Sequence, residues 1–270
     1  MKGERWLLAT ILLIFLALGV YYSVTVPIFE APDEIQHYFY VKHLADGNSL
    51  PVQDPNTPNL WAQEGSQPPL YYALAALVTR PVNTGRALDY LWPNPHRNIG
   101  NPFQPGNKNY MVHTPREAWP YRSLPLAVHL GRWFSLLLAT ATVLVTYLIV
   151  RDLSPDRPYL RLSVAATVAF IPQFAFISAS VSNDNMINLI ATLAIWQMIR
   201  LVLYDNGYTR VALLGLTVGL AALSKLSGLG LVALGLVALW LRYHRRETDT
   251  HPALDVILYL GVAVAVAGWW

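Results

Sequence analysis

The stretch FEAPDEIQHY, residues 29–38, lies where a long hydrophobic segment gives way to polar sequence. Its proline suits the first turn of a helix, where no backbone N–H is needed, and the acidic residues after it favour the positive end of that helix. In such a helix Asp33, Glu34 and His37 share one face, because residues three and four apart are neighbours. Two carboxylates and an imidazole at a membrane boundary suit a functional site, and an acidic helix start with a solvated histidine explains the same pattern.

The composition identifies the class of protein. The chain has 270 residues, of which 54% are hydrophobic and only 13% are charged. Because the apolar residues come in long blocks, we expect an all-α polytopic membrane protein rather than a soluble domain. The net charge of +3 comes from dispersed basic residues, which gives no nucleic-acid-binding surface. The chain contains no cysteine, which excludes disulfides, thiol catalysis and cysteine-based metal sites.

The hydrophobic blocks predict about seven transmembrane helices. They cover residues 6–26, 124–150, 162–181, 186–204, two short helices within 211–241, and 253–270. The first block is longer than the apolar region of a signal peptide and no small-residue cleavage site follows it, so we expect a retained anchor, with a signal peptide as the alternative. Pro172 should kink the third span. Lys225 should separate two short helices, since charge is expensive at mid-membrane.

The polar stretch between the first two spans is long enough to be structured. We expect residues 1–270 to form a single membrane domain in which 27–125 is an extracytoplasmic loop with short interfacial helices, one of them near 70–78. The N-terminus is basic and arginines gather in three later connections. Because basic connections stay in the cytoplasm, the N-terminus should be cytoplasmic in a multi-pass protein of the plasma membrane. The turn at 182–185 and Lys225 then lie on the outer side with the loop.

This topology collects separated polar residues on the outer side. They are Asp33, Glu34, His37, Asp184 and Lys225, with Arg132 at the outer end of the second span. Two carboxylates and a histidine can hold a divalent cation such as Mg, Mn or Zn, and basic side chains can hold a phosphate. A carboxylate can also act as a general base. Structural explanations stand beside these: Asp184 as a helix cap, and Lys225 and Arg132 as interfacial residues that reach toward water.

Other chemistry finds less support in the sequence. Glu34 and His37 form a Glu-x-x-His pattern, but a helical di-iron site needs a second such pattern, and none is present. There is no glycine-rich phosphate loop, no His-Glu-x-x-His zinc motif and no Gly-x-Ser-x-Gly elbow. Cytoplasmic nucleotide chemistry is therefore unsupported.

The order of several short motifs resembles a known family. They are APDE at 31–34 with HY at 37–38, QPPLYY at 67–72, GRWFS at 131–135, SND at 182–184 and GLAALSK at 219–225. This order resembles the GT-C superfamily of polytopic glycosyltransferases, in particular the protein-mannosyltransferase and aminoarabinose-transferase-like group. In that group one span precedes a long extracytoplasmic loop that opens with an acidic motif. The group continues through more spans, so the chain looks like its N-terminal part.

The resemblance implies a cell-envelope enzyme that moves a sugar from a polyprenyl-phosphate carrier to an extracytoplasmic acceptor, whose identity the sequence leaves open. It implies that Asp33 is the catalytic or metal-binding carboxylate, with Glu34 as a second catalytic carboxylate. Asp184 and His37 would then join Asp33 in holding the divalent cation.

Substrate contacts follow from the same resemblance. It implies that Arg132 and Lys225 contact the carrier phosphate at the depth of the lipid headgroups. Gln67, Tyr71 and Tyr72, from the QPPLYY motif, are the other expected substrate contacts. The main alternative function is a transporter or flippase for a lipid-linked or anionic substrate, which would use the same polar residues without chemistry.

Overall fold

The computed structural model describes residues 2–54, 56, 58–97, 103, 105–204, 207–245 and 251–270. The described chain is helical and has no strand, only an isolated bridge between Pro93 and Met111. Its α-helices are α1 (Lys2–Thr25), α2 (Glu34–Ala45), α3 (Leu70–Thr79), α4 (Ser123–Leu153), α5 (Pro158–Ala169), α6 (Pro172–Ser178), α7 (Asp184–Tyr204), α8 (Gly207–Ala222), α9 (Gly230–Arg245) and α10 (Pro252–Ala267). Short 3₁₀ helices are η1 (Ala62–Ser66), η2 (Ala87–Tyr90), η3 (Pro115–Glu117) and η4 (Leu226–Leu229). The expected all-α membrane fold is confirmed.

Fewer helices are long enough to cross a membrane than the seven that the sequence predicted. Among the described residues, four helices are long and apolar enough to cross a membrane: α1, α4, α7 and the η4–α9 unit. The α5–α6 pair makes a fifth if it is counted as one span, and it is bent by 63°. The apolar helices α8 and α10 have only 16 residues each, so the count of seven is not confirmed. The bend lies at Pro172, as predicted, because the proline has no N–H for the preceding turn.

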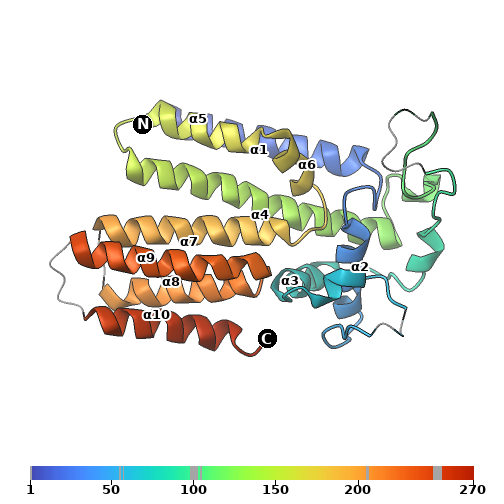
Figure 1. The fold of residues 1–270 in the computed structure, drawn as a ribbon. Helices are drawn as coiled ribbons and strands as arrows, with labels where there is room; N and C mark the ends of the chain where they lie inside the picture. The colour runs from blue at the N-terminus through green and yellow to red at the C-terminus, as the bar shows by residue number, and fades with distance from the viewer. Residues whose placement is uncertain are drawn as a thin grey trace.

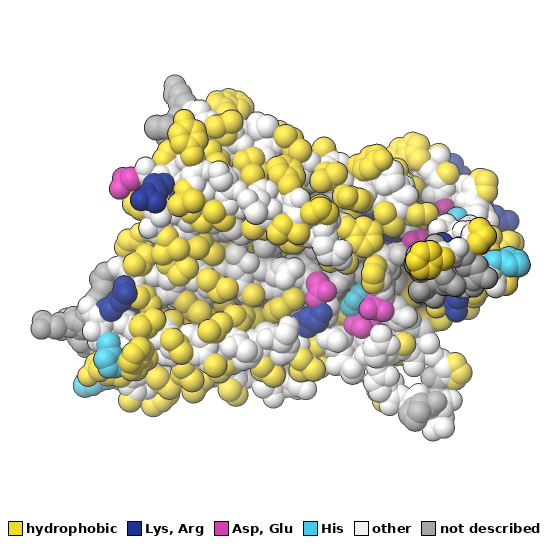
Figure 2. All heavy atoms as spheres, turned by 45° about the horizontal axis from the view of Figure 1, so that its top comes forward, with side chains coloured by type: hydrophobic (Ala, Val, Ile, Leu, Met, Phe, Trp, Pro, Cys, Tyr) yellow, Lys and Arg dark blue, Asp and Glu magenta, His cyan; other side chains and the backbone are white. Residues whose placement is uncertain are grey.

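The long helices lie side by side, and the segment between α1 and α4 is folded against one end of them (Figure 1). On the face that Figure 2 shows, hydrophobic side chains are spread along the bundle, which suits contact with a bilayer. Helices α8 and α10 approach closely because glycines face α10: a Cβ on Gly215 would lie 2.5 Å from the backbone oxygen of Tyr259. Short side chains at such contacts are the usual way for membrane helices to pack.

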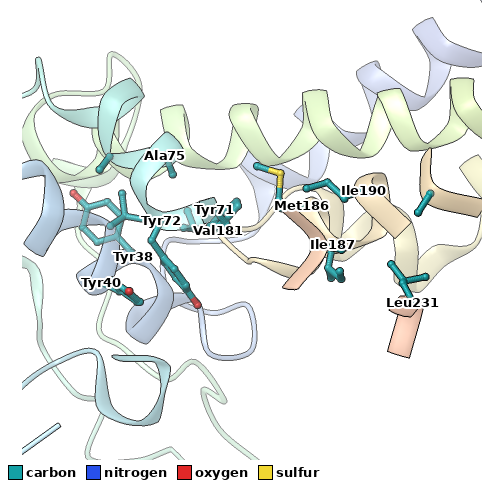
Figure 3. Packing of buried hydrophobic residues seen from close by; sticks show 14 of the residues in the cluster. Tyr38, Tyr40, Tyr71, Tyr72, Ala75, Val181, Met186, Ile187, Ile190 and Leu231 are labelled. Carbon is teal, nitrogen blue, oxygen red and sulfur yellow. The ribbon is translucent and has the colours of Figure 1, made fainter. Parts of the chain in front are cut away.

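A buried aromatic cluster joins the loop segment to the bundle (Figure 3). Tyr38 and Tyr40 of α2, Tyr71 and Tyr72 of α3, and Val181 before α7 belong to one hydrophobic core. The rings of Tyr40 and Tyr72 stack with centroids 3.9 Å apart. Helix α3 has ten residues, close to the predicted short helix at 70–78, and this cluster fixes its position.

A second contact holds the later part of the loop against the end of α1. The Glu30 carboxylate accepts hydrogen bonds from the backbone N–H groups of Tyr110 and Met111, at 2.7 and 2.9 Å. It also lies 2.8 Å from Nε2 of His113, whose Nδ1 lies 2.7 Å from a carboxylate oxygen of Glu117. Burial disfavours protonation of His113, but the hydrogen bonds to Glu117 and Glu30 outweigh it and raise the pKa.

Candidate functional site

Asp33 stands immediately before α2 in a strained backbone conformation. Its φ of 55° is in the left-handed region, which costs energy for residues other than glycine and which aspartate tolerates better than most. The helix begins at Glu34, so Asp33 is exposed and does not share the buried face of Glu34 and His37, contrary to the prediction. Its carboxylate makes no hydrogen bond or ion pair within the described chain. It lines a cavity of about 370 Å³ together with Gln36 and Tyr110.

Glu34 points the other way, into a fully buried ion pair with Arg132. The guanidinium donates from Nε to one carboxylate oxygen at 2.8 Å and from Nη2 to the other at 2.6 Å. Its remaining N–H groups donate to the backbone oxygens of Ser23, Val26 and Pro27, at 2.7 to 2.9 Å. Both side chains have 0% exposure. Such an arrangement meets the two requirements of a buried charge, a partner and complete hydrogen bonding.

The same pair gathers segments that are distant in sequence. Glu34 also accepts hydrogen bonds from the backbone N–H groups of Phe29 and Val181, at 2.9 and 3.0 Å. The end of α1, the start of α2, α4 and the segment before α7 thus meet at one carboxylate. The expected contact of Arg132 with a phosphate and the expected catalytic part for Glu34 are not supported, because neither group is accessible.

Asp184 and Lys225 form a second ion pair, which solvent can reach. The Lys225 ammonium donates to the Asp184 carboxylate, and the two side chains are 32% and 45% exposed. Asp184 begins α7, while Lys225 follows α8 at the break before η4, where two short helices were predicted to meet. The chain beside Lys225 also holds α3, because the Leu70 N–H donates to the backbone oxygen of Leu223 at 2.9 Å.

Three buried side chains from α2, η1 and α3 form a hydrogen-bonded group close enough to this ion pair for its charges to act on them. The Tyr72 hydroxyl lies 2.8 Å from Nδ1 of His37 and donates to Glu64 at 3.2 Å. The pKa of His37 falls to about 4, mainly because of burial; the charge of Asp184 opposes this effect, and that of Lys225 adds to it. Burial likewise raises the pKa of Glu64, against the hydrogen bond from Tyr72.

These interactions define the polar cluster, which consists of Asp33, His37, Glu64, Asp184 and Lys225. The charges of Asp33, Asp184 and Lys225 all act on the Glu64 carboxyl, and those of Asp184 and Lys225 act on His37. Figure 2 shows acidic, basic and histidine side chains gathered at one place, where the hydrophobic bundle meets the loop region. The groups come from the starts of α2 and α7, from η1 and from the break after α8, so the fold brings together four separated segments.

The expected substrate contacts of the QPPLYY motif are mostly buried. Tyr71 and Tyr72 have 0% exposure and are in the aromatic core (Figure 3). The Tyr71 hydroxyl lies 2.7 Å from the Ser135 hydroxyl and accepts the Ser182 N–H at 3.0 Å. Because both tyrosines are buried, they are better placed to support the polar cluster than to contact a sugar. Gln67 is half-buried, and its side-chain oxygen has no hydrogen-bond partner in the described chain.

The expected metal set of Asp33, Asp184 and His37 does not fit a divalent cation in this arrangement. Within the described residues no three His, Asp or Glu side chains form a metal-binding group. The Asp184 carboxylate is occupied by an ammonium, and Nδ1 of His37 by a hydroxyl. We therefore derive no step through a metal.

Sequence reasoning missed Glu64. It lies on the 3₁₀ helix η1, three residues before the motif at 67–72, and is 7% exposed. A glutamate in a proline-rich loop has no periodic pattern around it that would indicate burial. Only its position close before two prolines and two tyrosines connects it to the motif.

Comparisons with known proteins agree with this architecture. No curated protein sequence matches the chain. A solved structure titled as the S. cerevisiae protein O-mannosyltransferase Pmt1-Pmt2 complex bound to the sugar donor is similar in fold, with a TM-score of 0.65 and 19% sequence identity. The similarity covers 99% of this chain and 33% of the yeast chain, so this chain spans about a third of its length.

The sequence comparison identifies the family. The family model described as dolichyl-phosphate-mannose-protein mannosyltransferase matches residues 126–269, which extend from α4 into the residues after α10. The matched part includes Arg132, Asp184 and Lys225 and covers more than half of the chain. The resemblance to the GT-C mannosyltransferase group is confirmed, and the chain belongs to the dolichyl-phosphate-mannose-protein mannosyltransferase family.

Proposed function

We propose that this protein is a membrane glycosyltransferase that moves a sugar from a polyprenyl-phosphate carrier to an acceptor outside the cytoplasm. The proposal treats residues 1–270 as one membrane domain of the plasma membrane, with a cytoplasmic N-terminus and with 27–125 as its outer loop. Family membership supports a lipid-linked donor, because the family's description names dolichyl-phosphate-mannose.

One observation carries the assignment of the catalytic residue. Asp33 is the member of the polar cluster whose carboxylate is exposed and has no hydrogen-bonding or ionic partner within the described chain, and it lines a cavity. A carboxylate held in a strained conformation at the edge of a charged cluster is arranged for a ligand rather than for the fold. The other two carboxylates of the cluster already have partners: Glu64 accepts a hydrogen bond from Tyr72, and Asp184 pairs with Lys225.

In the proposed reaction, the acceptor oxygen attacks the anomeric carbon of the sugar and passes its proton to the Asp33 carboxylate. The bond between the anomeric carbon and the phosphate oxygen breaks, and the carrier leaves as polyprenyl phosphate. Lys225 stabilises the charge on that phosphate, because an ammonium has three N–H groups and the bond to Asp184 uses one of them. Asp184 keeps the ammonium in position.

The test is release of the free carrier. Membranes that contain the protein are incubated with polyprenyl-phosphate sugar, and polyprenyl phosphate is measured together with the sugar linked to acceptor. We expect release that depends on the protein and on Asp33. Movement of intact polyprenyl-phosphate sugar across the membrane without release of polyprenyl phosphate would instead identify a flippase and would overturn the proposal.

A further inference from the structure

A second polar pocket lies on α7 and α8, away from the polar cluster. Arg200 follows Asp184 by 16 residues on α7, which corresponds to about 24 Å along a helix. The pocket has a volume of about 280 Å³ and is lined by Trp196, Gln197, Arg200, Arg210 and Leu213. At the opposite end of the bundle from the cluster, two arginines and a tryptophan thus surround one cavity.

Arg200 is held in place by aromatic rings. Its guanidinium carbon lies 5.1 Å from the ring centre of Trp196 and 5.8 Å from that of Tyr204. The Trp196 Nε1–H donates to Asp152 at 2.9 Å, which fixes that ring. Nε of Arg200 lies 3.7 Å from the same carboxylate, too far for a hydrogen bond. The guanidinium is thus positioned, while its N–H groups make no hydrogen bond within the described chain.

Arg210 adds a second positive charge and, unlike Arg200, which lies 3.7 Å from the Asp152 carboxylate, has no partner in the described chain. It is half-buried in the first turn of α8, where the partial charge of the helix is also positive. Two guanidinium groups on one pocket repel each other, and the Asp152 carboxylate near Arg200 is shared with Trp196 and Arg151. An anion in the pocket would relieve this repulsion, and arginine binds phosphate with paired hydrogen bonds.

The wall of the pocket also includes a buried amide and an exposed apolar surface. The amide nitrogen of Gln197 donates to the Thr217 hydroxyl at 2.9 Å, while its side-chain oxygen is buried and has no partner in the described chain. Leu213 lines the pocket and is 47% exposed, and Leu216 continues this exposed apolar surface one turn further along α8. The pocket thus offers a surface for a phosphate and, beside it, an apolar surface for an acyl chain.

We propose that this pocket binds the headgroup of an anionic glycerophospholipid such as phosphatidylglycerol. Arg200 and Arg210 hold the phosphate, and the acyl chains lie along the exposed leucines of α8. Basic pockets between membrane helices are a recurrent form of lipid recognition. The site is independent of the sugar-transfer proposal, because it uses none of the residues of the polar cluster.

The test compares lipid binding to the purified protein by native mass spectrometry. Wild-type protein should retain phosphatidylglycerol in preference to phosphatidylcholine. The double variant Arg200→Gln with Arg210→Gln should bind phosphatidylglycerol roughly 30-fold more weakly, from the usual contribution of two interfacial arginines. Arg200→Lys with Arg210→Lys should keep most of the binding, because the charges remain.

The control variant is Arg157→Gln, which removes the same charge from an exposed arginine in the turn between α4 and α5, at the same end of the bundle. It should bind phosphatidylglycerol like the wild type. Inorganic phosphate is the probe for a free anion and should not displace the lipid. Equal phosphatidylglycerol binding by the glutamine double variant and the wild type would overturn the proposal, as would full displacement of the lipid by inorganic phosphate.

Discussion

The guanidinium of Arg132 forms two parallel hydrogen bonds with the carboxylate of Glu34, 98 positions away in the sequence. Neither side chain is exposed, and the remaining N–H groups of Arg132 bind backbone oxygens at the end of α1. The two adjacent acidic residues at the start of α2, Asp33 and Glu34, thus have different roles. Glu34 holds four segments together, and Asp33 is left facing solvent.

Removing one charge of this pair should destabilise the fold. Glu34→Gln leaves the buried guanidinium without its counter-charge, which typically costs about 3–5 kcal/mol. Denaturant or thermal unfolding in detergent measures the loss. The matched control is Arg86→Gln, which breaks the exposed pair with Asp89 and should change stability little. A Glu34→Gln protein as stable as the control would show that the pair contributes no stability.

Substitution at Asp33 should separate activity from stability. We expect Asp33→Asn to abolish release of polyprenyl phosphate while membrane insertion and expression stay near normal, because the carboxylate is exposed and has no partner in the described chain. Asp46→Asn serves as the control, since it changes an exposed carboxylate at the other end of α2. Unchanged release by Asp33→Asn would remove Asp33 from the reaction.

Lys225→Gln should weaken use of the donor. Loss of a charged hydrogen bond to the phosphate should lower kcat/KM for the donor by about 10- to 100-fold. Lys225→Arg should recover part of this loss, because the positive charge remains. Steady-state kinetics with varied donor concentration provide the measurement, and Lys42→Gln in α2 is the control. Equal kcat/KM for Lys225→Gln and wild type would mean that Lys225 does not contact the phosphate.

The contact of His113 with Glu30 and Glu117 should loosen as pH rises. Because the folded state raises the pKa of His113, its contribution to stability is complete below the unfolded value of about 6.5. That contribution is lost as pH rises through the folded value. Hydrogen exchange at the amides of Tyr110 and Met111, corrected for the intrinsic rate, should therefore show less protection at high pH.

The control for this effect is His113→Asn, in which the protection of the two amides should no longer depend on pH beyond the intrinsic rate. Both amides are bonded to Glu30, so they report directly on the contact. An identical pH dependence in wild type and His113→Asn would contradict the assignment to His113.

Local sequence signals predicted two breaks between helices. Pro172 marked the bend between α5 and α6, and Lys225 marked the break after α8, because proline lacks an N–H and a charge avoids the membrane interior. These effects act within a few residues of their cause, so the sequence displays them directly.

Side-chain contacts between residues that are far apart in the sequence could not be predicted in the same way. Asp33 and Glu34 are adjacent and chemically alike, and only the position of Arg132, fixed by packing of α4, decides which one is buried. Glu64 was missed for the same reason, since its burial depends on Tyr72 and His37 from other helices. Topology anticipated that Asp33, His37, Asp184 and Lys225 lie at the same end of the bundle, but not that Glu64 joins them or that Glu34 and Arg132 form a separate buried pair.

The backbone bond from Leu70 to Leu223 has a mechanical consequence. This hydrogen bond joins the first turn of α3 to the chain two residues before Lys225. Movement of either segment therefore displaces the other or breaks the bond. If the Lys225 ammonium moves when it binds the phosphate of the donor, α3 moves with it. Tyr72 of α3 and Glu64, which accepts a hydrogen bond from the Tyr72 hydroxyl, then move as well. Arrival of a donor at Lys225 would then be transmitted to Tyr72 and Glu64 through this backbone hydrogen bond.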